Sequence, residues 1–317
     1  MLRVGFILFE GFQSMTLSVL SVFEYANLAA GKPVYDLRML SETGEMVRSS
    51  TGMTVGTEAF DTKSFDTLII GGAADTLHVP SSALVAFLQR GLVTARRVAS
   101  VCTGAFILAA AGLLDGRRAT THWWYSQEMR TRYPKVKMEI DRIFVSDGPV
   151  WSSAGMTAGM DLALAMVEKD LGAEIARNVA QKLVMYHRRV GGQSQHSALL
   201  ELAPKSDRIQ QALTFARENL HKPLSVEQLA EAAHLSPRQF SRAFRAETGQ
   251  SPAKAIESLR LETARLMMEQ TRHSIDFVAD ETGFFDPRRM RQAFLRRFGH
   301  TPQVIRRHAR GMVGVSL

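Results

Sequence analysis

The first two thirds of the chain alternates short apolar runs with longer stretches that carry apolar residues at helical spacing. The short runs are rich in β-branched residues and indicate strands, whereas the longer stretches indicate amphipathic helices. The successive strand and helix pairs are Val4–Leu8 with Thr16–Ala30, Thr67–Ile70 with Ser81–Leu92, and Val98–Val101 with Thr103–Leu114. Because most of these strands are apolar throughout, both faces of their sheet should be buried. The pattern predicts an α/β domain built on a parallel-sheet sandwich.

A second pattern follows this alternation. The runs Ile143–Val145 and Val150–Ser152 are separated by turn-forming residues at 147–149, which predicts an antiparallel hairpin. Helical spacing then continues from about Thr157 to His187.

The last third of the chain has a different character. Glycines 191 and 192 open a stretch with neither period, so we expect an α/β domain over residues 1–190 and a linker over residues 191–205. Over residues 206–310 helical patterns follow one another, separated by proline-containing breaks. Serines stand where N-caps belong, at Ser225, Ser236 and Ser274. The segment is predicted to be all-helical.

An internal repeat lies within this helical segment. The stretch Phe240–Pro252 lines up with Met290–Pro302 at an offset of 50 residues, and Leu229-Ala230 matches Val278-Ala279 one residue out of step. Each copy indicates a helix, a short turn and a second helix, with a small residue where the two helices cross. The pattern predicts two successive helix-turn-helix units.

The second helix of each unit carries the candidate DNA contacts. Its apolar anchors are spaced four residues apart, Phe240 and Phe244 in one copy, Met290 and Phe294 in the other. If the anchors are buried, arginine, glutamine and serine side chains face outward, and these types read base edges or hold phosphates. The outward-facing candidates are Arg238, Gln239, Ser241, Arg242, Arg245, Arg288, Arg289, Arg291 and Gln292. We predict that both helices lie in major grooves of double-stranded DNA.

The charge distribution agrees with this prediction. Residues 205–317 hold 19 Lys and Arg against 12 Asp and Glu, while residues 1–204 hold 20 against 19. Nearly the whole positive excess therefore lies in the helical third. A basic segment attached to a nearly neutral one indicates a polyanionic partner for that segment.

Composition limits the remaining classes of protein. The 317 residues are 45% apolar and 22% charged, as in ordinary globular domains, and the length suggests two of them. The longest apolar run, Ala105–Leu114, is too short to span a bilayer. A single cysteine, Cys102, excludes an internal disulfide and a cysteine-rich zinc site and fits the reducing cytoplasm. We expect a cytoplasmic protein without membrane contact, metal or cofactor.

Cys102 is the main candidate for chemistry in the first domain. It stands between a predicted strand and a predicted helix, the arrangement of a nucleophile elbow, in which a tight turn presents the side chain at a helix N-terminus. Gly71 and Gly72 follow an earlier strand and offer amides to an oxyanion or carboxylate, and His122 lies in a loop before Trp123. The predicted ligand-binding residues are Thr16, Gly71, Gly72, Cys102, Thr103 and His122.

The helical segment resembles the AraC/XylS family of regulators from Asp207 to about His308. The resemblance rests on the duplicated unit, the ending Phe294-x3-Phe298-Gly299-x-Thr301-Pro302 and the pattern Arg260-Leu261-x2-Ala264. It implies groove-facing positions for Arg238, Ser241, Arg242, Arg288, Arg291 and Gln292. Two positions depart from the family pattern: His234 stands where a glycine is common in the first turn, and Gln292 stands where an arginine is frequent. Histidine tolerates the positive φ that such a turn requires.

Residues 1–190 resemble the PfpI/ThiJ-like branch of the class I glutamine amidotransferase-like fold, which is flavodoxin-like. The same branch fused to an AraC-type module describes the GlxA-like regulators. Catalytic members place a carboxylate near the start of the first helix, where this chain has Thr16, with Glu10 as a possible substitute if the strand end points inward. By this resemblance Cys102 and His122 are remnants of a catalytic pair, and the domain is not an enzyme.

These observations predict a transcriptional regulator, and family resemblance favours an activator. The first domain is expected to bind a small metabolite, with amino-acid-derived compounds among the candidates, and to form a homodimer. An activator would also contact RNA polymerase. The alternative is a cysteine-dependent PfpI-type hydrolase or amidotransferase-like enzyme that carries a DNA-binding tail. A redox sensor that uses the Cys102 thiolate is a third hypothesis.

Overall fold

The computed structural model describes residues 1–61, 64–73, 76, 79–185, 189, 191, 195, 202, 204 and 206–311. The chain divides into two compact units, Met1–Gln195 and His196–Leu317, and the division falls within the stretch expected to be the linker. The helical pattern expected to reach about His187 ends at Lys182 instead, and residues 186–188 and most of residues 191–205 lie outside the described residues.

The first unit is built on a mostly parallel sheet. Among its described residues seven strands form one sheet in the order β10 (Phe144–Asp147), β11 (Val150–Ser153), β7 (Arg97–Val101), β6 (Thr67–Ile70), β1 (Leu2–Ile7), β2 (Tyr35–Ser41) and β5 (Glu58–Ala59). Within that sheet only the β10–β11 pair is antiparallel, which confirms the predicted hairpin at one edge. Two short pairs accompany the sheet, β3 (Met46–Arg48) with β4 (Thr54–Gly56) and β8 (Arg118–Ala119) with β9 (Lys137–Met138).

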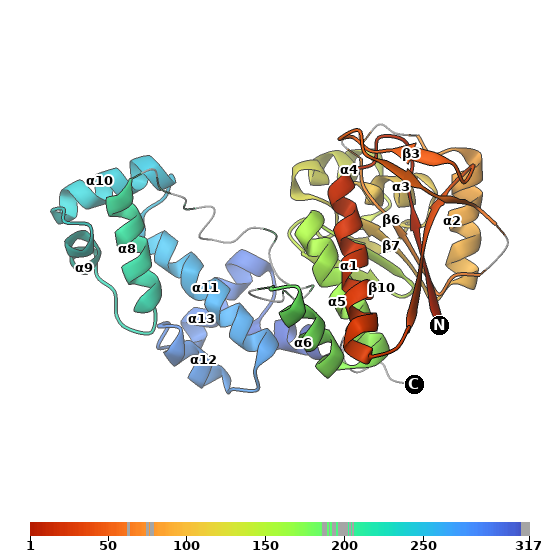
Figure 1. The fold of residues 1–317 in the computed structure, drawn as a ribbon. Helices are drawn as coiled ribbons and strands as arrows, with labels where there is room; N and C mark the ends of the chain where they lie inside the picture. The colour runs from red at the N-terminus through yellow and green to blue at the C-terminus, as the bar shows by residue number, and fades with distance from the viewer. Residues whose placement is uncertain are drawn as a thin grey trace. The chain divides into compact units, whose positions relative to one another are not determined.

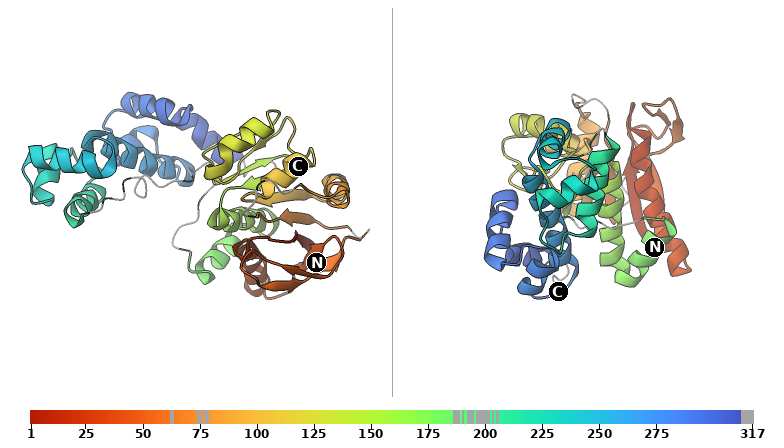
Figure 2. Two further views of the ribbon diagram at one scale, coloured as in Figure 1. Left: turned by 90° about the horizontal axis from the view of Figure 1, so that it is seen from above. Right: turned by 90° about the vertical axis from the view of Figure 1, so that its left-hand side faces the viewer.

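Alternating side chains of the central strands divide the core into two layers. Phe6 of β1 and Val101 of β7 pack with α1 (Ser18–Ala30), α5 (Met156–Leu171) and α6 (Ala173–Lys182). On the opposite face Ile7 and Val98 pack with α2 (Ser82–Thr94), α3 (Gly104–Ala110) and α4 (Ser126–Arg132). Both faces of the sheet are thus covered, as the apolar strands predicted (Figure 1, Figure 2).

Some element boundaries differ from the prediction. The helix expected from Thr16 begins instead with a 3-10 turn, η1 (Ser14–Leu17), because the Thr16 hydroxyl donates to the Gln13 carbonyl at 2.6 Å. The helix expected to reach Leu114 ends at Ala110, before Gly112 at φ +77°. The strand β2 was not predicted, since its charged and half-buried positions form no apolar run.

The second unit is helical throughout its described residues, as predicted. Its helices are α8 (Asp207–Glu218), α9 (Val226–Ala232), α10 (Pro237–Thr248), α11 (Pro252–Gln270), α12 (Ile275–Glu281), α13 (Pro287–Phe298) and α14 (Pro302–Gly311). Ser225 and Ser236 each form a capping box, and Ser274 caps α12, so the three predicted N-caps are confirmed.

Two hydrophobic clusters lie side by side in this unit. One packs Phe240 and Phe244 of α10 against α8 and α9, and the other packs Met290 and Phe294 of α13 against α12 and α14. The helix α11 serves both clusters, through its residues 255–259 in the first and through residues 261–268 in the second. The repeat seen in the sequence is therefore a repeat of two small cores that share one helix.

Candidate functional site

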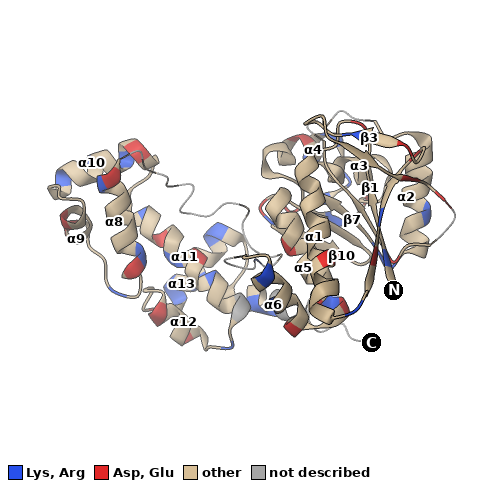
Figure 3. Ribbon diagram, viewed as in Figure 1, with Lys and Arg blue, Asp and Glu red and all other residues tan. Residues whose placement is uncertain are grey.

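The outward faces of α10 and α13 form the candidate DNA interface. The four anchors are at most 2% exposed. The side chains between them point away from the cores: Arg238, Gln239, Arg242, Arg245, Arg288, Arg289, Arg291 and Gln292 are exposed or half-buried at the surface, and Ser241 is half-buried. All nine predicted DNA-contact residues thus lie at the surface of α10 and α13, and Figure 3 colours the Lys and Arg positions of the chain blue. Each helix offers a positively charged surface of the width that a major groove admits.

One of the nine residues also has a structural task. The Oε1 atom of Gln239 accepts hydrogen bonds from the Ser236 backbone N–H at 3.2 Å and from the Ser236 hydroxyl at 2.8 Å. This capping box holds the first turn of α10. The remaining amide hydrogens of Gln239 are the part of its side chain that can face a base.

The turns between the paired helices adopt left-handed backbone conformations. His234 has φ +53° in the first unit and Gly283 has φ +73° in the second. The expectation that histidine would accommodate the first turn is confirmed. The two helix-turn-helix units therefore reach the same chain reversal with different residues.

The second turn also contacts the first helix-turn-helix unit. A Cβ atom on Gly283 would lie 2.0 Å from the carbonyl oxygen of Leu220, which precedes α9. Arg260 of α11 donates from Nε to the same carbonyl at 3.2 Å and from Nη2 to the Lys222 carbonyl at 2.7 Å. Burial lowers the pKa of Arg260, and the nearby charge of Arg289 lowers it further. The contact of Gly283, Leu220 and Arg260, which we call the inter-unit contact, joins the segment before α9 to the turn between α12 and α13.

The elbow predicted at Cys102 is present. Cys102 lies between β7 and α3 with φ +58°, a conformation that few residues other than glycine adopt. Its backbone N–H donates to the carbonyls of Ser153 at 3.1 Å and Ala154 at 2.9 Å. The strained turn is thus held by strand β11 and the residue that follows it.

The thiol of Cys102 lies in an environment that keeps it neutral. The residue is 3% exposed, and burial raises its pKa, an effect that hydrogen bonds from Thr103 only partly offset. The Thr103 hydroxyl itself donates to the Ala73 carbonyl at 2.6 Å. Because the thiolate is the nucleophilic form, a neutral buried thiol is poorly suited to covalent catalysis.

The other ligand-site candidates gather around this elbow. A Cβ atom on Gly72 would lie 2.5 Å from Thr103 Oγ1 and 3.3 Å from Cys102 Cβ, and one on Gly71 would lie 2.7 Å from Thr16 Oγ1. Thr16 is fully buried. The structure therefore brings these five predicted residues together from three separate segments of the chain.

Glu10 does not take the place of the carboxylate that catalytic members have at the position of Thr16. It is exposed, and its Oε2 accepts a hydrogen bond from the Arg48 backbone N–H at 3.3 Å. The condition for Glu10 to act as a substitute, that it points inward, is not met. Among the described residues no cluster of His, Cys, Asp and Glu is arranged to hold a metal ion.

His122 is half-buried and follows Thr121, whose hydroxyl donates to the Cys102 carbonyl at 2.9 Å. Its Nδ1 accepts from the Trp124 backbone N–H at 3.3 Å, its ring stacks on Trp123 at 5.7 Å between centroids, and a Cβ atom on Gly155 would lie 2.9 Å from its Cδ2. Trp123 and Trp124 are 42% and 68% exposed. Neither tryptophan was among the predicted ligand-binding residues, although adjacent tryptophans in a predicted loop were a usable signal.

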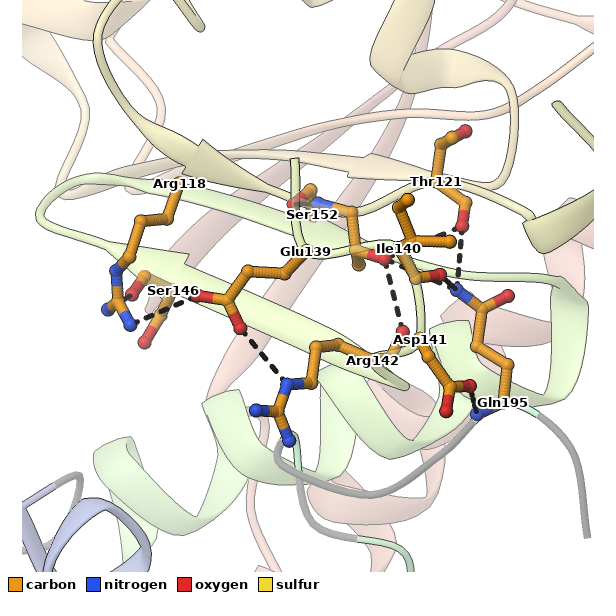
Figure 4. A network of polar contacts seen from close by, with 10 residues as sticks. Arg118, Thr121, Glu139, Ile140, Asp141, Arg142, Ser146, Ser152 and Gln195 are labelled. Carbon is orange, nitrogen blue, oxygen red and sulfur yellow. Dashed lines mark hydrogen bonds and ion pairs between the residues drawn. The ribbon is translucent and has the colours of Figure 1, made fainter. Parts of the chain in front are cut away.

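Gln195 was not predicted to have a role, because it falls in the stretch expected to be the linker. Its Oε1 accepts from the Trp123 backbone N–H at 2.8 Å. Its Nε2 donates to the carbonyls of Thr121 and Ile140, each at 2.9 Å (Figure 4). The segment Gly191-Gly192-Gln193-x-Gln195 resembles the joining segment of the GlxA-like regulators, but this resemblance did not indicate these contacts, because the partners are groups far away in the chain.

Two family models match the chain. The DJ-1/PfpI family model matches residues 2–169, and a helix-turn-helix domain model matches residues 229–308. The chain is 31% identical over 314 residues to the HTH-type transcriptional regulator GlxA of Rhizobium meliloti (strain 1021), which covers 97% of this chain and 96% of that protein. Both predicted domains therefore have counterparts in one regulator.

Two further comparisons concern the first unit. The isonitrile hydratase of Pseudomonas putida is 33% identical over 185 residues, which covers 57% of this chain and 78% of that enzyme. The crystal structure of an AraC family transcriptional regulator from Pseudomonas putida superposes with a TM-score of 0.53 at 24% identity and covers 58% of this chain and all of that one. The α/β fold thus occurs both in a protein named as an enzyme and in one named as a regulator. No helix in the described parts of the chain is long and apolar enough to cross a membrane.

Proposed function

This chain belongs to the HTH-type transcriptional regulators that join a DJ-1/PfpI domain to an AraC-type helix-turn-helix domain, and we propose that a small metabolite held near Cys102 controls its binding to DNA. In this proposal α10 and α13 contact the bases of the DNA. It assigns effector binding to the elbow cluster of Thr16, Gly71, Gly72, Cys102, Thr103 and His122.

The observation that supports DNA reading most directly is the pairing of two basic helix faces in one unit. The inter-unit contact joins Gly283, Leu220 and Arg260, so α10 and α13 are presented together and not independently. Two reading helices held in this way enter successive major grooves about 10 base pairs apart. The preferred DNA site should therefore contain two short groups of bases at a constant spacing.

The two halves of the site should be read differently. The first helix presents Arg238 and Arg242, with part of Gln239 engaged in the capping box. The second presents a denser cluster, in which Arg288, Arg289 and Arg291 precede Gln292. Arginine clusters favour phosphate contacts as well as guanine edges, whereas glutamine favours adenine. We propose an asymmetric site in which the second half relies more on the DNA backbone.

Arg242→Ala tests the assignment of base reading. A duplex enriched from a random-sequence pool by the full chain serves as the preferred site, and an unrelated duplex measures non-specific binding. Fluorescence anisotropy should show a loss of about 1–3 kcal/mol on the preferred duplex and little change on the other. The matched control is Arg217→Ala, which removes an exposed arginine from α8, a helix that carries none of the predicted DNA contacts. Equal weakening on both duplexes would make Arg242 a phosphate contact and refute its proposed role.

The elbow cluster supports effector binding better than catalysis. Its thiol is buried and neutral, Glu10 points to solvent, and the Thr16 hydroxyl is engaged with the Gln13 carbonyl. A nucleophile without an activating base or carboxylate is a poor catalyst. Backbone groups, two threonines and exposed tryptophans nevertheless offer polar and aromatic contacts to a small amino-acid-derived compound. The same burial disfavours a redox sensor, which needs an accessible thiolate.

Thermal unfolding of the full chain tests effector binding. In a screen of amino acids and their amide and quaternary-amine derivatives, an effector should raise the unfolding temperature in a concentration-dependent way. Thr103→Val, which keeps the side-chain volume and removes the hydroxyl, should reduce the shift. Unaltered shifts in this variant would place the binding site elsewhere.

A cysteine-dependent enzyme is the competing function, favoured by the elbow geometry and by the similarity to isonitrile hydratase. Cys102→Ser distinguishes the two, because a regulator keeps its effector-dependent DNA binding whereas an enzyme loses turnover. We also propose that the regulator acts as a homodimer and as an activator that contacts RNA polymerase. Sedimentation of the full chain and transcription from a linked promoter measure these two properties separately.

A further inference from the structure

Gln195 stands where the first unit ends, yet its side chain is bonded entirely within that unit. Its amide donates to the Thr121 and Ile140 carbonyls and its oxygen accepts from the Trp123 N–H, while its own backbone N–H donates to Asp141 Oδ1 at 2.8 Å. Every polar atom of the side chain is therefore satisfied by the fold. Such complete pairing is unusual for a residue of a connecting segment, where polar side chains generally face water.

Two of the partners of Gln195 flank His122, a member of the elbow cluster. They lie on both sides of His122, at the carbonyl before it and the N–H after it. The Thr121 hydroxyl in turn donates to the Cys102 carbonyl at 2.9 Å. Gln195 thus holds the segment that carries His122 and Trp123 against the loop of Ile140 and Asp141, and the Thr121 hydroxyl joins the same segment to the turn that carries Cys102. A shift of that segment by a bound effector would stretch or break these bonds.

The groups that bind the Gln195 side chain, which we call its seat, are themselves held by a polar network. Asp141 lies in the loop before β10, whose Arg142 carbonyl accepts from the Thr120 hydroxyl at 3.2 Å, and Arg142 pairs with Glu139 at 3.1 Å. The Thr120 N–H also donates to the Ser152 hydroxyl at 2.9 Å, and this bond joins the segment before His122 to β11 (Figure 4). Networks of this kind are rigid when fully paired, so the position of Gln195 reports on the position of the loop.

Whether Gln195 is bound in its seat determines how many residues lie between the last residue fixed on the first unit and Leu202 of the helical unit. Upstream, Gly191 packs so closely on β10 that a Cβ atom there would lie 2.6 Å from the Phe144 carbonyl oxygen. Downstream, Leu202 is buried in the core of the helical unit. With Gln195 seated, the connection from Gln195 to Leu202 can span at most about 25 Å. With Gln195 released, the connection from Gly191 can span about 40 Å.

From these contacts we infer that Gln195 is a positioning residue that couples the elbow cluster to the DNA-binding unit. Seated, it holds the His122 segment and keeps the connection short; released, it loosens both. The inference rests on the proposed function and names how the same site is regulated. Because coupling between two sites is reciprocal, a restraint placed on the helical unit by DNA must alter the segment around His122.

Hydrogen exchange of the full chain, with and without the enriched duplex, tests this coupling. In the wild-type protein, saturating duplex should change the exchange rate of peptides that cover residues 120–125 by at least about twofold. Gln195→Glu keeps the acceptor for the Trp123 N–H but directs a carboxylate oxygen at two carbonyls. It should speed exchange of these peptides without DNA and abolish their response to DNA. Gln195→Ala should have the same two effects.

The matched control is Gln89→Ala, which removes a glutamine that donates to the Ala111 carbonyl in the same unit, away from the elbow. It should respond to DNA like the wild-type protein. Duplex binding without any change at residues 120–125 of the wild-type protein would overturn the coupling and leave the DNA-binding function intact. If both Gln195 variants keep the wild-type change in exchange at residues 120–125 on DNA binding, the coupling is likewise overturned and the DNA-binding function is left intact. Failure to bind any duplex would overturn the proposed function and the inference with it.

Discussion

Replacing Gly283 by alanine isolates the contact between the two helix-turn-helix units. The added methyl group would lie 2.0 Å from the carbonyl oxygen of Leu220 and 2.8 Å from Arg260 Nε. Gly249, the C-cap of α10, has the same φ of +73°, but a methyl group added there would meet no other part of the fold within 4 Å. Gly249→Ala therefore carries the backbone penalty alone, and Gly283→Ala carries that penalty together with a steric clash.

The two contributions have separate magnitudes. Alanine at positive φ costs about 1 kcal/mol relative to glycine. At Gly283 the Leu220 carbonyl must also move by about 1 Å to restore an ordinary contact, and crowding of this kind costs about 1–3 kcal/mol. The movement weakens the hydrogen bond from Arg260 to the same carbonyl. We expect Gly249→Ala to lower the free energy of unfolding of the helical unit by about 1 kcal/mol and Gly283→Ala to lower it by about 2–4 kcal/mol.

Unfolding of the α/β unit and unfolding of the helical unit can be followed separately in the full chain. All three tryptophans and all five tyrosines precede residue 196, so their fluorescence reports on the first unit only. Urea unfolding followed by ellipticity at 222 nm includes the helical unit. Gly283→Ala should lower the midpoint of the ellipticity change for that unit by about 1 M urea and leave the fluorescence midpoint unchanged.

Equal midpoints for the two alanine variants would refute the reasoning, because the clash with Leu220 would then cost nothing. A shift of the fluorescence midpoint by Gly283→Ala would also contradict it, since the contact lies wholly within the helical unit.

Three further predictions concern other parts of the chain. Ser236→Ala removes the cap of α10 and should lower the free energy of unfolding of the helical unit by about 1 kcal/mol in the same ellipticity assay, and no change would mean that the capping box contributes nothing. Asp170→Asn leaves the buried Arg97 guanidinium without its counter-ion and should destabilise the first unit by about 3 kcal/mol by fluorescence, whereas Asp36→Asn at a partly exposed ion pair should cost less than about 1 kcal/mol; similar losses would contradict the role of burial. Burial raises the pKa of Cys102, so as pH rises the unfolded chain ionises first, and the thiol's contribution to stability, complete below its ordinary pKa, is lost as pH passes through the raised value. Iodoacetamide should therefore modify the native protein more slowly than the unfolded protein at about pH 8. Equal rates would disprove a protected thiol.

Local patterns were sufficient to predict the fold class and the exposed basic faces of α10 and α13. The period of apolar residues places Phe240 and Phe244 on one face of a helix, so the neighbouring arginines must face outward whatever the tertiary structure is. The elbow at Cys102 was predictable for a similar reason, because the strand, the cysteine and the helix are contiguous in the chain. Prediction was poorer at element ends and for β2, where partly exposed positions leave no apolar run and pairing with β1 decides the structure.

What the sequence by itself determined is the set of contiguous features: two domains, the duplicated helix-turn-helix unit with its basic faces, and a cysteine in a tight turn. The tertiary structure alone decided which distant groups meet. It placed Leu220 against Gly283, turned Glu10 to solvent, and seated Gln195 beside His122. The physical reason is that periodicity and capping act over a few residues. Hydrogen bonds to backbone groups, by contrast, depend on where the fold brings those groups, and the sequence around the donor or acceptor side chain does not indicate its partners.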